Sequence, residues 1–133
     1  MVCKMLFFDY REIEKSFFEN NNISNFDINF FSQPLNIETV KNLTEDDLEK
    51  TSVISVFITS HITQDVIKHF KNLRVIATRS ARYGHIDLTS CINNNIALVN
   101  VEAYKNKPTD LILKESFDAI TGVLCGDRSA RII

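Results

Sequence analysis

The sequence predicts an α/β domain with a parallel sheet, because short apolar runs alternate along the chain with segments of helical periodicity. The apolar runs have the length of strands and carry few charges, which is typical of strands buried on both faces. Five strands in a chain of 133 residues favour a three-layer, flavodoxin-like domain with the strand order 2-1-3-4-5. The predicted strands are 1–8, 26–31, 53–58, 73–78 and 96–101.

The first predicted helix follows the first strand directly. Asp9 and Glu12 have the spacing of a capping box, so Asp9 is the expected N-cap. The apolar residues Ile13 and Phe17, together with the flanking Tyr10, then fall on one helical face. We therefore expect that face to pack on the sheet.

Polar residues mark the ends of the later helices. Residues 37–48 predict one short helix or two, and Thr63 and Asp87 are the expected N-caps of the next two. Asn95 stands where a left-handed residue usually ends a helix. A last helix is expected from Pro108, with one apolar face formed by Leu113, Phe117, Ile120 and Leu124.

Composition and charge exclude several classes of protein. A formal net charge of -2, with no basic cluster, argues against nucleic acid or an anionic membrane surface as a partner. The apolar stretches are far too short to span a bilayer. Three scattered cysteines form neither a disulfide framework nor a zinc motif, so the expected location is the cytoplasm.

Glycine content argues against a nucleotide site within these residues. The chain has three glycines, Gly84, Gly122 and Gly126, and no two of them are two residues apart. A dinucleotide fingerprint needs closely spaced glycines so that the backbone can approach the pyrophosphate. We therefore expect no cofactor in this chain.

Residues 78–88, TRSARYGHIDL, resemble the signature loop of the D-2-hydroxyacid dehydrogenases, in which a strand runs into an R-S-x-G-[YF]-[DN]-[HN]-[IV]-D-L pattern. Residues 96–104 are similar to the G-I-x-V-x-x-V-P-A-Y stretch that follows in this family. The resemblance covers residues 1–104 and implies the substrate-binding domain. It also implies that the catalytic Arg, Glu and His belong to a nucleotide-binding domain that these residues do not include.

The C-terminal region carries a second resemblance. Residues 115–126, ESFDAITGVLCG, are similar to the helix with which the family's chain returns to the substrate domain. The expected organisation is therefore one domain over 1–133, formed by an N-terminal segment over residues 1–104 and a returning helix and tail over residues 108–133. Residues 105–108 would bridge the place of the nucleotide-binding domain.

The resemblance also names candidate substrate-binding residues. They are Ser80, Ala81, Arg82, Tyr83 and Tyr104, whose counterparts help to hold the substrate carboxylate. Arg82 departs from the pattern, because the family has Gly there. Its side chain is either a new clamp for a carboxylate or a solvated loop residue. His85 occupies a position of turn hydrogen bonding, and we assign it no catalytic role.

Two functions follow as hypotheses. The first is a module that is not catalytic alone and binds a small 2-keto or 2-hydroxy acid or a protein. The second is one subunit of a split D-2-hydroxyacid dehydrogenase, in which a separate chain supplies the NAD site. A remnant without a retained role is the third reading. A homodimer or partner protein over the face that the nucleotide-binding domain would cover is expected in either of the first two cases.

Overall fold

The computed structural model describes residues 3–20, 26–80, 82–100, 113–114, 117–118, 120–121 and 124. Five parallel strands form one sheet in the order β2-β1-β3-β4-β5, which confirms the predicted order. The strands are β1 (Cys3–Phe8), β2 (Phe26–Phe31), β3 (Thr51–Val56), β4 (Val75–Thr78) and β5 (Ala97–Asn100). The named helices are α1 (Glu12–Asn20), the 3-10 helix η1 (Thr39–Asn42), α2 (Glu45–Lys50), α3 (Gln64–Ile67) and α4 (Leu88–Asn93).

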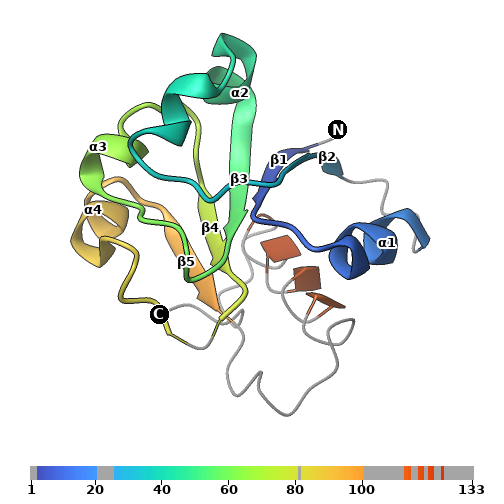
Figure 1. Ribbon diagram of the computed structural model, residues 1–133. Coiled ribbons are helices and arrows are strands. Elements are labelled where there is room, and N and C mark those ends of the chain that lie inside the picture. The colour runs from blue at the N-terminus through green and yellow to red at the C-terminus, as the bar shows by residue number, and fades with distance from the viewer. Residues whose placement is uncertain are drawn as a thin grey trace.

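Two apolar clusters lie on opposite faces of the sheet. Alternation along β1 divides its side chains between them, since Leu6 and Phe8 join one cluster whereas Met5 and Phe7 join the other. Helices α2, α3 and α4 cover the first face, and α1 covers the second together with the described C-terminal residues (Figure 1). The molecule therefore has the three layers expected of a doubly wound α/β domain.

The C-terminal residues pack as their periodicity predicts. Leu113, Phe117 and Ile120 are buried, and Leu124 packs against the same cluster. The Phe117 ring lies 4.9 Å from the Phe18 ring and 5.0 Å from the Phe26 ring, both edge to face. This aromatic contact joins the last helical segment to α1 and to the start of β2.

Most of the predicted caps are confirmed. The Thr63 side chain accepts from Val66 N and the Asp87 side chain accepts from Ser90 N. Asn95 has a φ of 56°, as expected for a left-handed residue after a helix. Thr44 and Asp47 form a capping box for α2, so residues 37–48 contain η1 and the start of a separate helix.

The predicted start of the first helix is wrong. Asp9 has a φ of 52°, and its carboxylate accepts from the Thr59 hydroxyl at 2.5 Å instead of capping a helix. The helix begins at Glu12, and the Glu14 carboxylate accepts from Arg11 N at 2.8 Å. On the predicted inward face, Tyr10 and Phe17 do pack against the second apolar cluster, but the Ile13 side chain is 59% exposed.

Candidate functional site

The loop that carries the predicted site lies at the carboxyl edge of the sheet. It connects β4 to α4, and the ends of all five parallel strands meet at this edge. Two backbone hydrogen bonds hold it to the segment after β3: Ile62 N donates to His85 O at 2.9 Å, and Asp87 N donates to Ile62 O at 2.8 Å. These bonds therefore fix the loop to the segment that connects β3 to α3.

Arg79 anchors the start of this loop beneath the surface. Its Nη2 donates to Phe8 O at 2.7 Å and to Asp9 O at 3.1 Å, and its Nη1 donates to the Ser55 hydroxyl at 3.2 Å. The guanidinium also lies 4.0 Å from the centre of the Phe7 ring. A single side chain thus joins β4 to the end of β1 and to β3.

Glu14 supplies the countercharge for this buried arginine. Arg79 Nε and Glu14 Oε2 are 3.0 Å apart, and both side chains are 3% exposed. Burial lowers the pKa of Arg79 to about 10, and the nearby Glu14 charge opposes that shift. Arg79 therefore stays cationic at neutral pH, with both of its Nη groups donating to protein acceptors.

Sequence reasoning missed the Arg79–Glu14 pair. Glu14 precedes the buried Phe18 by four residues, so the two share the inward face of α1. A carboxylate on the apolar face of a helix signals a buried partner, because an unpaired charge there would be very costly. That signal was present in the sequence, but it did not identify Arg79, which is 65 positions further along (79 − 14).

A chain of hydrogen bonds fixes the middle of the loop. The Ser80 hydroxyl donates to Arg82 O at 2.7 Å, so its single proton is used. Thr78 Oγ1, which lies 2.7 Å from Ser80 Oγ, must then donate to Ser80. Its proton is used as well, and His85 Nε2, at 3.0 Å, must donate to Thr78. The network therefore assigns a proton to Nε2 of His85.

The same contacts define what His85 can do. Burial lowers the pKa of His85, and the neighbouring His61 acts in the same direction. His85 bonds to Thr78 at the end of β4, which agrees with the structural role expected for it. The neutral ring leaves Nδ1 as an acceptor, while Nε2 holds the loop.

The structure places the predicted substrate-binding residues in two groups. Ser80 is fully buried and its hydroxyl serves the turn, whereas Arg82 is exposed and Tyr83 is 39% exposed. The contact between Ser80 Oγ and Arg82 O brings two of them together. Ala81 and Tyr104 lie outside the described residues. The role of all five in binding a substrate stays a prediction.

The turn between β1 and α1 does not fit a nicotinamide dinucleotide. A dinucleotide-binding domain places its phosphate-binding glycines in this turn and the pyrophosphate at the helix N-terminus. Here the turn consists of Asp9, Tyr10 and Arg11, and the Glu14 carboxylate already occupies Arg11 N. Glu12 and Glu14 also make the first helical turn acidic. A phosphate would meet carboxylates where it needs free amides.

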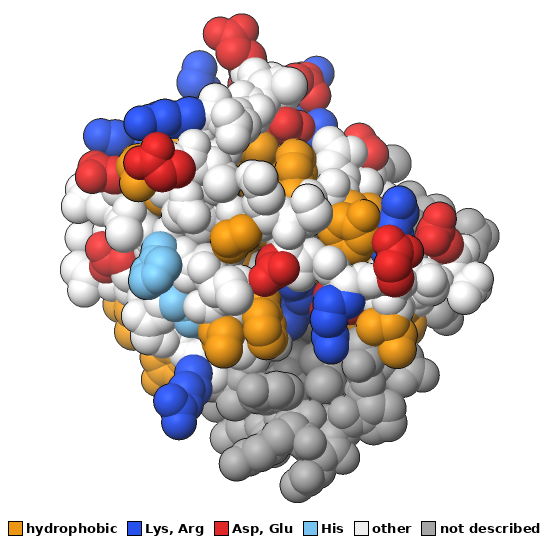
Figure 2. All heavy atoms as spheres, viewed as in Figure 1, with side chains coloured by type: hydrophobic (Ala, Val, Ile, Leu, Met, Phe, Trp, Pro, Cys, Tyr) orange, Lys and Arg blue, Asp and Glu red, His pale blue; other side chains and the backbone are white. Residues whose placement is uncertain are grey.

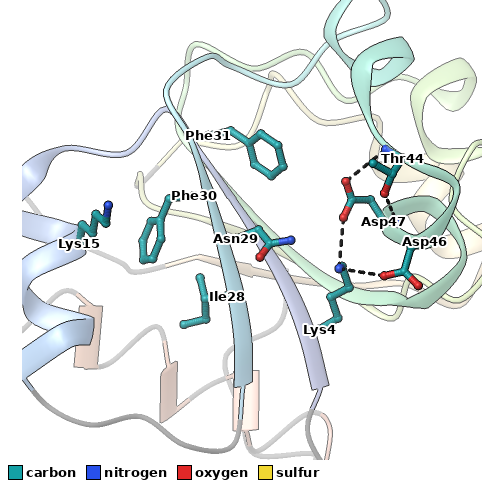
Figure 3. A pocket seen from close by; sticks show the side chains of 9 residues that line it. All are labelled: Lys4, Lys15, Ile28, Asn29, Phe30, Phe31, Thr44, Asp46 and Asp47. Carbon is teal, nitrogen blue, oxygen red and sulfur yellow. Dashed lines mark hydrogen bonds and ion pairs between the residues drawn. The ribbon is translucent and has the colours of Figure 1, made fainter.

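A second concave feature lies away from the loop, along the outer side of β2. This hollow has a volume of about 610 Å³ and is open to solvent. Side chains from both faces of the sheet line it (Figure 3). They are Lys4, Lys15, Ile28, Asn29, Phe30, Phe31, Thr44, Asp46 and Asp47.

The surface shows no concentration of one charge on the face that Figure 2 displays, where acidic, basic and apolar side chains are interspersed. Among the described residues, no cluster of three or more His, Cys, Asp or Glu side chains could hold a metal ion. Over the same described ranges, no helix has the length and apolar character needed to cross a bilayer.

Comparison with solved structures shows the same fold in two D-lactate dehydrogenases and a pyruvate reductase. The apo-structure of D-lactate dehydrogenase from Escherichia coli matches with a TM-score of 0.65 and 20% identity, over 77% of this chain and 32% of that one. D-lactate dehydrogenase from Aquifex aeolicus, complexed with NAD and lactic acid, matches with a TM-score of 0.65 and 23% identity, over 89% of this chain and 33% of that one. The pyruvate reductase of Chlamydomonas reinhardtii matches with a TM-score of 0.64 and 21% identity, over 96% of this chain and 39% of that one.

The chain therefore spans between about a third and two-fifths of the length of these relatives. A search of curated proteins finds no match. The family model described as "D-isomer specific 2-hydroxyacid dehydrogenase, catalytic domain" matches residues 5–110, which is most of the chain and includes the whole signature loop. This chain belongs to the D-isomer specific 2-hydroxyacid dehydrogenase family.

Proposed function

We propose that this domain binds a small 2-keto or 2-hydroxy acid at the loop after β4 and does not transfer hydride by itself. The observation that carries the proposal is the arrangement of the loop. Its inner residues, Arg79 and Ser80, are bonded within the protein, and its outer residue, Arg82, is exposed. A turn at the carboxyl end of a parallel strand is a usual place for an anion.

Arg82 supplies the charge in this proposal. A guanidinium can bind a carboxylate through two parallel hydrogen bonds, which is stronger and more directional than a single contact. The turn below it is held by Ser80 and His85, so binding would order the side chain of Arg82 and little of the backbone. The expected role is that of a binding or regulatory module.

A thermal-shift screen over small 2-keto and 2-hydroxy acids tests this proposal. A ligand that binds the folded chain raises its melting temperature, and the stabilisation grows with the logarithm of the ligand concentration. The shift should disappear in Arg82→Gln and persist in Arg74→Gln, because Arg74 is exposed at the opposite edge of the sheet, before β4. Equal shifts in both variants, or no shift with any acid, would exclude a carboxylate site at this loop.

A split enzyme is the second candidate. Three of the large exposed hydrophobic residues, Ile13, Ile58 and Tyr83, belong to segments at the carboxyl edge of the sheet. Exposed apolar side chains beside a site favour a covering partner. In a split enzyme, a separate chain binds NAD and covers the carboxyl edge of the sheet, so that the substrate site lies between the two chains.

Complementation distinguishes the two candidates. The purified chain with NADH and a 2-keto acid should show no turnover, and a lysate of source cells from which the gene for this chain is deleted should restore turnover only if a partner supplies the nucleotide site. An Ile58→Asp variant should then lose the restored activity, because it places a charge in the proposed contact. Turnover that the lysate supplies equally without the chain would rule out the split enzyme.

A further inference from the structure

Strand β2 forms an outer edge of the sheet, and half of its backbone groups point outward. Its only neighbour among the described strands is β1. Phe31 O accepts from Tyr10 N, on the β1 side, at 3.3 Å. Alternate residues of a parallel strand direct both backbone groups to the same neighbour. Phe26, Ile28 and Phe30 therefore direct their N–H and C=O groups away from β1.

The outer edge of β2 has few of the features that usually prevent strand pairing, and Asp27 is its one charged residue. Natural edges are protected by proline, by lysine or by a bulge. β2 contains neither residue, and its register with β1 runs without interruption from Cys3↔Phe26 to Phe8↔Phe31. The open hollow described above runs along this edge, with Ile28, Asn29 and Phe30 half-buried beside it (Figure 3). Among the described strands, none pairs with this outer edge, so we treat it as a surface to which another strand can add.

The sequence of β2 is self-complementary. Residues 26–30 read Phe-Asp-Ile-Asn-Phe, which has the same apolar pattern in both directions around Ile28. The polar positions differ only as carboxylate and amide, so Asp27 on one strand can accept a hydrogen bond from Asn29 on another. A twofold interface requires this property, because the same patch must fit itself.

We propose that β2 pairs antiparallel with β2 of a second copy of this chain, about a twofold axis at Ile28. Ile28 lies opposite the partner's Ile28, and Phe26 lies opposite the partner's Phe30. These are the residues with outward backbone groups, so each pair exchanges two hydrogen bonds. Asp27 then lies opposite the partner's Asn29 in the closer, non-hydrogen-bonded position. The two five-stranded sheets become one continuous sheet.

The self-complementary register favours a second copy over an unrelated strand. Phe26 meets the partner's Phe30 and Asp27 meets the partner's Asn29, and the twofold symmetry makes each of these pairings occur twice. The interface lies on β2, away from the loop after β4, so it is independent of the function proposed above. A dimer formed there leaves the carboxyl-edge face of each copy open to its own ligand or partner.

Sedimentation equilibrium of the purified chain, with three sequences compared, tests the proposal. The unmodified chain should dimerise. Asn29→Asp places two carboxylates opposite each other at both symmetric positions and should raise the dissociation constant by about tenfold or more. The double variant Asp27→Asn with Asn29→Asp has the original residue composition and exchanges the two polar positions, so it should dimerise again.

Amide hydrogen exchange locates the interface at single residues. In the dimer, the Ile28 and Phe30 amides should be protected along with those of Asp27 and Asn29. In the Asn29→Asp variant, the Ile28 and Phe30 amides should exchange rapidly. The amides of residues 27 and 29, which face β1, should stay protected, and this protection would show that the strand is still folded. A chain that is monomeric at all concentrations, or a dimer whose dissociation constant is the same in both variants as in the unmodified chain, would overturn the proposal.

Discussion

At the scale of single residues, the loop after β4 depends on Arg79 and Glu14. Their side chains come from distant regions of the chain and meet at 3.0 Å in the interior, where each neutralises the other. A buried pair of this kind adds little net stability compared with apolar residues, yet the loss of one partner is costly, because the other charge remains. The pair therefore specifies where α1 lies relative to β4.

Glu14→Gln tests this role. The amide keeps the size of the side chain and can still accept from Arg11 N, but it leaves the Arg79 charge without its counterion. The free energy of unfolding, measured with urea, should fall by about 3 kcal/mol. Glu12→Gln is the matched control, since Glu12 is exposed on the same helix, and it should change stability by less than about 0.5 kcal/mol. Equal effects of the two changes would contradict the assignment.

His85 makes stability depend on pH in a defined direction. Because its pKa is lowered in the folded chain, the unfolded chain binds the proton more tightly. The stabilisation that the neutral form of His85 gives to the folded chain is complete above the ordinary histidine pKa of about 6.5 and is lost as the pH falls below that value. His85→Asn should reduce this pH dependence of the unfolding free energy, whereas His69→Asn should leave it intact. An unchanged profile in His85→Asn would show that other groups cause it.

At the scale of elements, the strands and most caps could be predicted from the sequence because they depend on local chemistry. Thr63 and Asp87 cap the helices that their spacing indicated, and Asn95 adopts the left-handed conformation. Asp9 was misassigned because its positive φ is set by contacts with Thr59 and Gln33, which are distant in sequence. The Arg79–Glu14 pair escaped prediction for the same reason. Of the candidate site, the loop could be predicted, but not which of its residues face inward.

The C-terminal helical segment is expected to be part of the core. Phe117 is 8% exposed and contacts the rings of Phe18 and Phe26. Phe117→Ala should therefore lower the free energy of unfolding by about 3–5 kcal/mol. Asp118→Ala, at the neighbouring exposed position, should have almost no effect. If urea denaturation gave the same midpoint for both variants, the segment would not be docked as described.

At the scale of the whole molecule, the chain combines a five-stranded parallel sheet with a β1–α1 turn unsuited to a dinucleotide. Membership of a dehydrogenase family describes the origin of the fold, while activity depends on the residues of a site. In the function proposed above, carboxylate recognition at the loop after β4 is therefore separate from hydride transfer, which requires a bound nicotinamide.

The most direct test of this separation is a calorimetric titration of the purified 133-residue chain with NADH. We expect no heat of binding beyond dilution, both with and without a saturating 2-keto acid, because the Glu14 carboxylate occupies Arg11 N and Glu12 adds a second acidic residue to the first helical turn. Saturable binding of NADH with one site per chain would contradict this expectation, whatever residues turned out to provide the site.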